Sequence, residues 1–408
     1  MRDVTRRAGA GLAAVLAWAG LLAGLAGCTN GVEVQLPGKA RSPYDAIRIS
    51  PEDGAKGIGV QGPLLVSVPD GRLERVRVKK VEDVQEEKVP GRISEDGLSW
   101  RPDDQTLALA AKYTVDVVAV DGHGRRQARH TTFTTYVPEE RFIGYFKPEN
   151  RSTVGTGMIV SFTFNRAIEN RAGVENAIKV TSKPPVEVVG HWFGKERLDF
   201  RPATYWKPGT EVTVDMRLRD VEAAPGSYGI QQKTVRFTVG RRQVSTVDVK
   251  AKTMVVRRDG AVLSTIPITA GAPKTTTYNG KMVVSEMFDV TRMNGASVGF
   301  RDKNGKSEYD VSDVPHAMRL TDSGTYLHGN YWAKPEWFGS VNITHGCIGL
   351  LDVKGGGPRT PAAWFFDRTL IGDVVEVVNS HDETVAPGNG LGGWNMTWDL
   401  WKAGSEAR

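Results

Sequence analysis

The residues best suited to chemistry lie in one short segment, Thr344-His345-Gly346-Cys347, and another histidine, His328, precedes the cysteine by 19 residues. A thiol attacks a carbonyl carbon effectively only as the thiolate, and a nearby imidazole can remove its proton or stabilise the anion. His345 is two residues before Cys347, and residues i and i+2 of a strand point to the same face. His328 can approach the thiol only through folding. These residue types are suited to nucleophilic catalysis by a cysteine.

Two other interpretations of the same residues stay open. Cys347 can be a small buried apolar side chain, and the residue types alone do not decide against this. Metal ligation is the second interpretation, and it needs Asp352 or water as a fourth ligand beside Cys347 and the two histidines. Gly346 lets the backbone approach a substrate closely and can direct amide N–H groups at an oxyanion, which suits catalysis.

The composition excludes several other classes of protein. With 2 cysteines in 408 residues, Cys28 and Cys347, the chain can form at most one disulfide and cannot build a cysteine-rich zinc site. A hydrophobic share of 40% and a charged share of 25% are globular values, and the length suggests about two to four domains. No RNP, zinc-finger or helix-turn-helix pattern occurs in the sequence, so we expect no nucleic-acid partner.

The first 27 residues have the pattern of a secretory signal. Arginines at positions 2, 6 and 7 precede an uncharged run from Ala8 to Gly27. The end of this run, Leu25-Ala26-Gly27-Cys28, resembles the bacterial lipobox, in which the cysteine is lipidated and becomes the mature N-terminus. An uncleaved signal anchor and soluble secretion are the alternatives. We therefore expect a lipoprotein signal at 1–27, a lipid on Cys28, and a protein on the extracytoplasmic face of the cell membrane, in the wall or periplasmic space.

Two repeats are expected after a tether at residues 28–45. Short runs of β-branched residues alternate with Gly, Pro and Asp from residue 46 to residue 240, which is typical of strands and turns. Leu98-Ser99-Trp100-Arg101-Pro102 recurs 100 residues later as Leu198-Asp199-Phe200-Arg201-Pro202. The repetition predicts two tandem Ig-like β-sandwiches, at 46–138 and 139–240, with the aromatic residue of each motif in a core. We expect both sandwiches to act as spacers.

The third domain, 241–380, is expected to be mostly β. Asp259-Gly260 predicts a hairpin turn, residues 372–379 predict a final buried strand, and 361–371 is the one segment with helical spacing. In the C-terminal extension, 381–408, tryptophans at 394, 398 and 401 fall on one helical face. We expect this extension to pack against the third domain or the second sandwich, with carbohydrate binding as the alternative.

His328, a gap of about 15 residues and then Thr344-His345-Gly346-Cys347 resemble the signature of the L,D-transpeptidase (YkuD) family. With the lipobox and the two repeats, the chain is similar to the actinobacterial multi-domain lipoprotein branch of that family over residues ~45–408. The resemblance implies a mainly β fold: two tandem Ig-like β-sandwiches, a β-rich catalytic domain with one short helix, and a C-terminal extension.

The resemblance also implies a cysteine acyltransferase that cross-links peptidoglycan. Cys347 would attack the carbonyl of the diaminopimelyl residue in a tetrapeptide donor stem, releasing D-alanine and leaving a thioester. The diaminopimelyl side-chain amine of an acceptor stem would then take the acyl group and complete a 3→3 cross-link. His328 would serve as general base and acid, oriented by the backbone carbonyl of Gly329, with His345 in support. The implied partners are peptidoglycan stems and the membrane, and no metal or organic cofactor is implied.

Further substrate contacts follow from the same resemblance. The oxyanion and substrate residues would be Gly346, Thr344, Tyr309, Ser323, Gly324 and Gly349, beneath a lid at 285–315. Gly349 departs from the family, which commonly has Asn or Arg there, and Gly329 stands where some members have Ser. A carbapenem is expected to acylate Cys347, because its strained lactam mimics the donor. Hydrolysis of the donor to a tripeptide, sortase-type acyl transfer and non-catalytic wall binding are the alternative functions.

Overall fold

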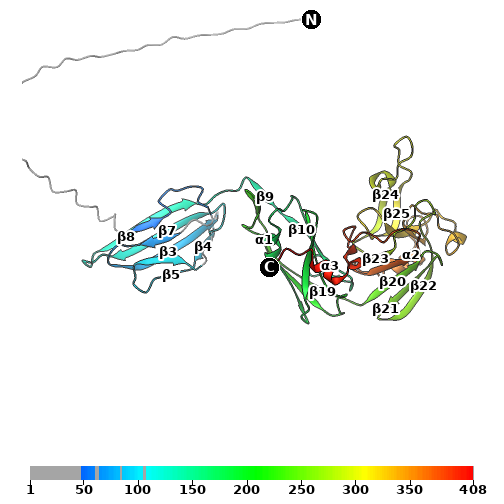
Figure 1. Cartoon of the computed structure of the whole chain (residues 1–408), viewed down its shortest axis with the longest axis horizontal. Coiled ribbons are helices and arrows are strands. Elements are labelled where there is room, and N and C mark those ends of the chain that lie inside the picture. Colours follow the sequence, from blue (N-terminus) through cyan, green and yellow to red (C-terminus); the bar gives the residue numbers. More distant parts are fainter. Residues whose placement is uncertain (1–46, 60–63, 83–84, 104–106, 408) are drawn as a thin grey trace, which may run out of the picture.

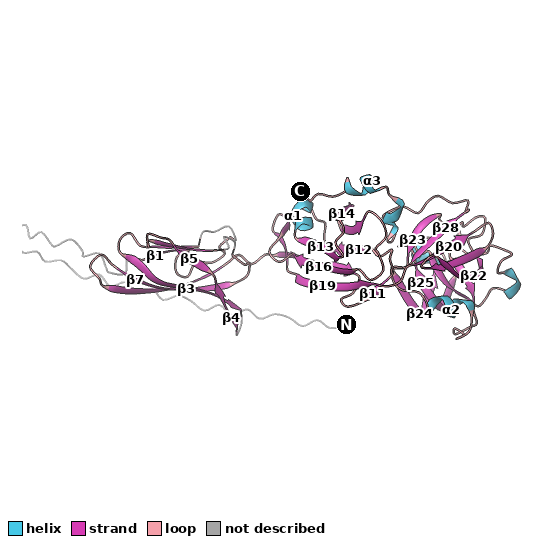
Figure 2. Cartoon of the chain, turned by 90° about the horizontal axis from the view of Figure 1, so that it is seen from below, coloured by secondary structure: helices cyan, strands magenta, loops and turns pink. Residues whose placement is uncertain are grey.

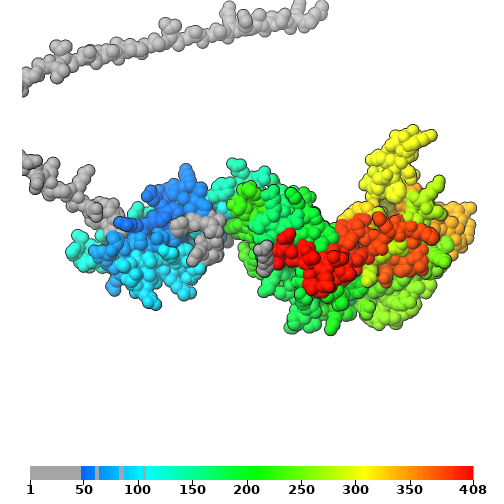
Figure 3. Space-filling view, in the orientation of Figure 1, coloured from blue at the N-terminus to red at the C-terminus, as the bar shows by residue number. Residues whose placement is uncertain are grey.

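The computed structural model describes residues 47–59, 64–82, 85–103 and 107–407. Three bodies follow one another along the chain: two β-sandwiches and a third, larger β domain (Figure 1). The second sandwich lies directly against the third domain (Figures 2 and 3). A single connecting segment joins the first sandwich to the second (Figure 2). The expected signal at 1–27, the lipidated Cys28 and the tether at 28–45 lie outside the described residues. No helix in the described ranges combines the length and the apolar character needed to cross a membrane.

The first sandwich consists of two sheets. Its strands are Arg48–Ser50 (β1), Leu65–Ser67 (β2), Arg72–Glu82 (β3), Gln85–Val89 (β4), Gly91–Ile93 (β5), Ser99–Pro102 (β6), Lys112–Val120 (β7) and Arg126–Thr134 (β8). The sheet orders are β1-β2-β6-β5 and β4-β3-β7-β8. Val66 pairs with Trp100 across β2 and β6, and both are buried with Phe133, whose ring stacks on Tyr113. Alternating apolar residues of the facing sheets thus form the core.

The second sandwich repeats this plan. Its strands are Glu140–Phe142 (β9), Gly144–Lys147 (β10), Thr153–Val154 (β11), Val160–Phe164 (β12), Ile178–Lys183 (β13), Val188–Phe193 (β14), Arg197–Pro202 (β15), Glu211–Arg217 (β16), Glu222–Ala224 (β17), Ser227–Gly229 (β18) and Gln232–Val239 (β19), with the helix Arg171–Asn176 (α1). The main sheets have the orders β10-β12-β15-β14 and β11-β19-β16-β13. Val160 pairs with Phe200 as Val66 pairs with Trp100, and both aromatic residues are buried. The predicted repeat is therefore confirmed, down to the strand register.

The third domain is built on one long sheet. Its strands are Gln243–Asp248 (β20), Thr253–Arg258 (β21), Ala261–Thr269 (β22), Gly280–Val283 (β23), Glu286–Asn294 (β24), Asp310–Arg319 (β25), Tyr326–Asn330 (β26), Ile348–Leu351 (β27) and Val374–Val378 (β28), with Gly295–Val298 (η2), Pro335–Trp337 (η3) and the helix Pro361–Phe366 (α2). The sheet order is β23-β28-β20-β21-β22-β27-β26-β25-β24. Asp259 and Gly260, both with positive φ, make the predicted hairpin turn between β21 and β22. The hairpin of β24 and β25 projects from the body of the domain (Figure 1).

The helix predicted at 361–371 is shorter than expected. Thr360 caps α2 and the helix ends at Phe366, after which the hydroxyl of Thr369 donates to the carbonyl of Phe365. The amide of Leu370 then donates to the buried carboxylate of Asp373, which turns the chain into β28. Apolar spacing continued beyond Phe366, but these polar bonds end the helix. Among the described residues, α1 is a further short helix that the periodicity did not predict, whereas the helix Trp398–Lys402 (α3) contains Trp398 and Trp401, which the spacing placed on one helical face.

The C-terminal extension packs on both of its expected partners: Trp394 and Trp401 contact the second sandwich, and Asn395 bonds to Lys281 of the third domain. It contains Gly392–Asn395 (η4) and α3. Trp401 is fully buried and its indole N–H donates to the carbonyl of Val189, while the indole N–H of Trp394 donates to Gly157. The guanidinium of Arg201 lies 4.4 Å from the ring centre of Trp401 and 4.8 Å from that of Trp394. The motif arginine of the second repeat thus holds the tryptophans by cation–π contacts.

Candidate active site

Neighbouring parallel strands bring the two candidate catalytic residues together. β26 carries His328, and β27 begins at Ile348, directly after Cys347. The register pairs Leu327 with Ile348 and His328 with Gly349. Both His328 and Cys347 line a cavity of about 370 Å³, called here the catalytic pocket. Its walls are Met293, Tyr309, Val311, His328, Asn330, Trp332, Trp337, Ile343, Thr344, His345 and Cys347.

The Cys347 thiol is buried at the bottom of a tight turn. Gly346 has φ 104°, a backbone conformation that glycine adopts without strain. The hydroxyl of Thr344 donates to the carbonyl of Cys347 over 2.6 Å and fixes the turn. The amide of Tyr326 donates to Sγ at 3.4 Å, and Sγ donates to the carbonyl of Gly324 at 3.6 Å. Burial raises the pKa of Cys347 to about 11, against the weaker opposing effect of the Tyr326 amide, so the thiol is protonated at neutral pH.

The His328 imidazole is buried, neutral and held in one orientation. Its Nδ1 lies 3.0 Å from the carbonyl oxygen of Gly329. A carbonyl oxygen only accepts hydrogen bonds, so Nδ1 carries the proton and Nε2 carries the lone pair. Trp332 stacks on the imidazole, with 5.5 Å between ring centres. Burial lowers the pKa of His328, which keeps Nε2 available as a proton acceptor.

A cluster on the β24–β25 hairpin closes one side of the pocket. Tyr309 lies 4.9 Å from the ring centre of His345, and Phe300 lies 5.5 Å from the same ring. Nε2 of His345 is 3.4 Å from a carboxylate oxygen of Glu308. Burial raises the pKa of Tyr309 to about 12, so its hydroxyl is a neutral donor. The segment predicted as a lid therefore supplies a wall of the pocket.

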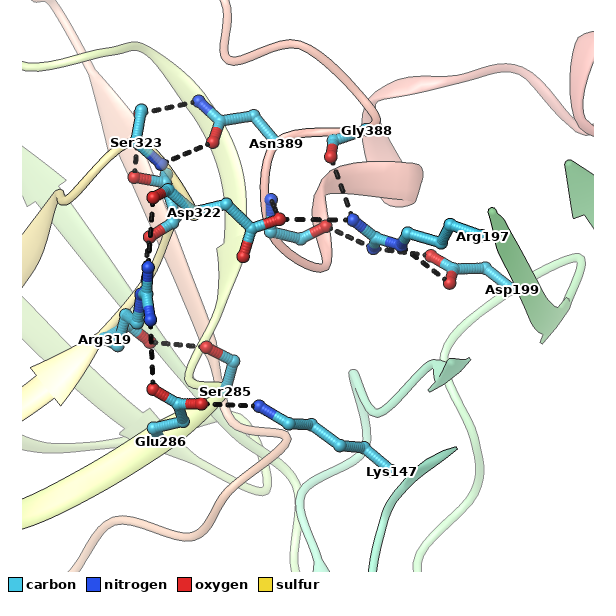
Figure 4. Close-up of polar contacts among 12 residues, drawn as sticks. Lys147, Arg197, Asp199, Ser285, Glu286, Arg319, Asp322, Ser323, Gly388 and Asn389 are labelled. Atoms are coloured by element: carbon cyan, nitrogen blue, oxygen red, sulfur yellow. Dashed lines mark hydrogen bonds and ion pairs between the residues drawn. The ribbon is translucent and has the colours of Figure 1, made fainter. Parts of the chain in front are cut away.

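Ser323 and Gly324 are neighbours in sequence but contact different parts of the protein: Gly324 contacts the thiol, and Ser323 contacts the C-terminal extension. Gly324 touches the nucleophile through its carbonyl, and a Cβ on it would lie 2.4 Å from a methyl carbon of Val298. Ser323 does not line the catalytic pocket. Its amide donates to Oδ1 of Asn389, and Nδ2 of Asn389 donates to its hydroxyl over 2.8 Å (Figure 4). Ser323 therefore joins the catalytic domain to the C-terminal extension.

The two glycines that depart from the family pattern leave no room for a side chain. A Cβ on Gly349 would lie 2.8 Å from Cγ2 of Thr269 and 3.1 Å from Nδ2 of Asn330. A Cβ on Gly329 would lie 2.2 Å from a carboxylate oxygen of Asp352. Real Cβ atoms do not approach neighbours so closely, so both positions require glycine in this packing.

Some pocket residues escaped the sequence analysis. Asn330 is buried in the pocket wall, and its position two residues after His328 on β26 could have identified it, since i and i+2 share a face. Trp332 and Trp337, which lie between the two motif histidines in the sequence, also line the pocket and were not missed in this way. The half-buried His316 and the buried Asp352, which form a pair outside the pocket, lie 36 positions apart in sequence and have no local signal. Within the described ranges, no set of three or more His, Cys, Asp and Glu side chains is grouped to hold a metal ion.

Comparison with known proteins places these features in a family. Residues 242–377 match the family described as the L,D-transpeptidase catalytic domain (YkuD), and residues 55–222 match the bacterial Ig domain (Big_10). L,D-transpeptidase 2 of Mycobacterium tuberculosis is 34% identical over 353 residues, which cover 86% of this chain and 83% of that protein. L,D-transpeptidase 5 of the same species is 28% identical over 384 residues, covering 92% and 80%.

A solved structure of the LD transpeptidase LdtMt1 in complex with imipenem covers 59% of this chain and 100% of its own, at 27% identity and a TM-score of 0.48. The similarity to L,D-transpeptidase 2 covers far more of this chain than the third domain alone. This chain, with its cysteine and histidine in one pocket, belongs to the L,D-transpeptidase family.

Proposed function

We propose that this protein forms 3→3 peptidoglycan cross-links by cysteine acyl transfer. The observation that carries the proposal is the common pocket of Cys347 and His328, with Nδ1 of His328 bound to the Gly329 carbonyl. That bond leaves Nε2 as the basic nitrogen of a residue that lines the same pocket as the thiol. Family membership supports transpeptidation as the chemistry of this pair.

Acylation begins with a neutral thiol and a neutral imidazole. Nε2 of His328 takes the Sγ proton as Sγ bonds to the diaminopimelyl carbonyl carbon of the donor stem. The amides of Gly346 and Cys347 and the neutral hydroxyl of Tyr309 are the donors that we assign to the developing oxyanion. The imidazolium then gives its proton to the leaving amine of D-alanine. A thioester on Cys347 and a neutral His328 remain.

Deacylation reverses these proton transfers. The side-chain amine of an acceptor stem attacks the thioester and gives a proton to His328. The tetrahedral intermediate collapses, the new amide forms, and the proton returns to Sγ. The largely apolar wall of Met293, Val311, Trp332, Trp337 and Ile343 supports amine attack over attack by water, because it limits hydration of the pocket.

Product analysis tests the proposal. Purified full-length protein is incubated with a disaccharide-tetrapeptide, and the products are followed by mass spectrometry beside Cys347→Ser. We expect a dimer whose mass is that of two monomers minus one free D-alanine, and we expect it to be absent with the variant. A tripeptide as the sole product would favour hydrolysis instead. An unchanged tetrapeptide with correctly folded protein would contradict the proposal.

We also propose that Cys28 carries a lipid and holds the enzyme on the outer face of the cytoplasmic membrane. The lipobox at Leu25-Ala26-Gly27-Cys28 supports this location. Cell fractionation provides the test: the wild-type protein should sediment with membranes, and Cys28→Ala should not. Recovery of both proteins in the same fraction would contradict lipid anchoring.

A further inference from the structure

A buried carboxylate lies behind the candidate general base, on the opposite side of its strand from the pocket. His328 and Asn330 face the catalytic pocket, so Gly329 between them faces the other way. Asp352 is the first residue after β27, and its side chain packs against Gly329 on that face. Its carboxylate occupies the space that a Cβ on Gly329 would need. The Asp352 side chain has no exposed surface. A carboxylate so buried requires partners for its oxygens.

Asp352 has those partners on three elements. Its Oδ1 accepts hydrogen bonds from the amides of Val353 at 2.8 Å and Gly357 at 3.0 Å, and from the hydroxyl of Thr360 at 3.0 Å. Its Oδ2 lies 2.7 Å from Nδ1 of His316 on β25. Thr360 is the N-cap of α2, so this carboxylate joins β27, the loop before α2, and β25. These strands flank β26 on both sides.

The position of Gly329 matters because its carbonyl orients the imidazole. The Gly329 oxygen accepts the Nδ1–H of His328, so any rotation of that peptide turns the ring and its Nε2. Asp352 packs against the Gly329 Cα and blocks movement in that direction. Resting on the proposed function, we infer that Asp352, anchored by His316, is the positioning residue for His328.

The carboxylate also acts on the imidazole electrostatically. Burial lowers the pKa of His328, and the Gly329 carbonyl and then the Asp352 charge oppose this effect. The titratable groups that face His328 are Cys347, Tyr309 and His345 on the pocket side, with Glu308 beyond His345, and Asp352 with His316 behind the strand. Asp352 thus keeps the base stronger than burial alone would leave it.

The test compares acylation of Cys347 by imipenem across pH in the full-length protein, followed by intact mass. Asp352→Asn keeps the side-chain shape but removes the charge. We expect its plateau rate to fall by roughly 10- to 100-fold, as for a small misplacement of a reacting group. The fall in rate on the acidic side of the pH–rate profile, the acid limb, should move to lower pH. Without the nearby negative charge the pKa of His328 is lower, so the imidazole stays neutral to a lower pH. A merely structural defect would not move the limb in this direction.

A second variant separates anchoring from charge. His316→Leu leaves the Asp352 charge in place but removes its Oδ2 partner, so the plateau rate should fall without a shift of the acid limb to lower pH. Asp373→Asn is the matched control, because it alters another buried carboxylate of the domain, one that pairs with Arg241. It should leave the plateau rate and the position of the acid limb unchanged.

The outcomes are distinguishable from those for the proposed function. If wild-type protein is not acylated, the proposed function fails first. If wild type reacts and folded Asp352→Asn matches it in rate and acid limb, the positioning role is overturned. Should Asp352→Asn fail to fold, His316→Leu decides: a slower plateau supports the role, and a wild-type plateau overturns it.

Discussion

At the scale of single residues, burial holds both reacting side chains in their uncharged forms. It raises the pKa of Cys347 to about 11 and lowers that of His328, so a preformed thiolate–imidazolium pair is not the resting state. Proton transfer must then accompany attack on the substrate. The Gly329 carbonyl matters in this setting because it selects the tautomer with a basic Nε2.

Alkylation of Cys347 should depend on pH as expected for a protonated thiol. Iodoacetamide reacts with the thiolate, and a pKa of about 11 leaves roughly one thiolate in a thousand at pH 8. The rate at Cys347, separated from Cys28 by peptide mapping, should rise with pH beyond pH 9. Denatured protein, in which the thiol is solvated, should react faster at neutral pH. A rate that levels off below pH 8 would refute the protonated resting state.

The two motif histidines should differ in their effect on turnover. His328→Gln removes the base and should lower kcat by about 100- to 10,000-fold at neutral pH. His345→Gln is the matched control: His345 contacts Tyr309 and Glu308 at the pocket wall, so its loss should act more on KM than on kcat. Steady-state kinetics with a tetrapeptide donor provide the measurement. Equal losses of kcat in both variants would argue against His328 as the sole base.

At the scale of secondary structure elements, the parallel pair β26–β27 creates the site, and much of this was predictable. The motif identified His328, Cys347 and Gly329, and the repeat located Trp100 and Phe200 in matching registers. The His316–Asp352 pair was not predictable, because its partners meet only when β25 and β27 flank β26. The end of α2 also depends on tertiary contacts, since the turn that follows uses the buried Asp373.

A side chain introduced at Gly349 should destabilise the sheet. Gly349→Asn introduces a side chain where Thr269 and Asn330 already stand, so the variant should lose about 1–3 kcal/mol of unfolding free energy through overpacking. Chemical denaturation measures the loss. Asn330→Ala opens the same space, and Gly349→Asn in that background should recover part of the stability. Full stability of the single variant would show that the neighbours move aside freely.

Removal of the Trp401 side chain should destabilise the packing of the C-terminal extension. It is fully buried against the second sandwich and lies over Arg201, so Trp401→Ala should destabilise the protein by about 3–5 kcal/mol. Leu400, next to it on α3 but 60% exposed, is the control, and Leu400→Ala should change the stability by less than about 0.5 kcal/mol. Thermal unfolding of both variants tests the contrast. Similar melting temperatures would contradict the packing role of the extension.

At the scale of the whole molecule, the second sandwich and the catalytic domain form one unit. Lys147 of β10 pairs with Glu286 of β24, and Arg197 of β15 pairs with Asp322 (Figure 4). Val283, Leu391 and Trp394 share a continuous core with the second sandwich. Asp322 precedes Ser323-Gly324, whose glycine carbonyl accepts the thiol hydrogen bond. The second sandwich therefore supports the loop beneath Cys347, beyond the spacer role expected for it.

Deletion variants should reveal this unit. Removing residues 47–138 should leave the main calorimetric transition near its wild-type temperature, because the first sandwich has its own core. Removing residues 47–240 should lower the stability of the catalytic domain markedly, since it exposes Val283, Leu391 and Trp394. Equal melting temperatures for the two truncated proteins would contradict the shared core.

The most direct measurement is the intact mass of the protein shortly after mixing with a disaccharide-tetrapeptide and quenching in acid. We predict a covalent adduct that raises the protein mass by the mass of the donor minus that of free D-alanine, because the thiol hydrogen leaves with the amine of D-alanine. The adduct should map to the peptide containing Cys347, be labile to hydroxylamine as a thioester is, and be absent from Cys347→Ser. Product formation with no adduct at Cys347, or an adduct that persists in Cys347→Ser, would contradict the assignment of Cys347 as the nucleophile.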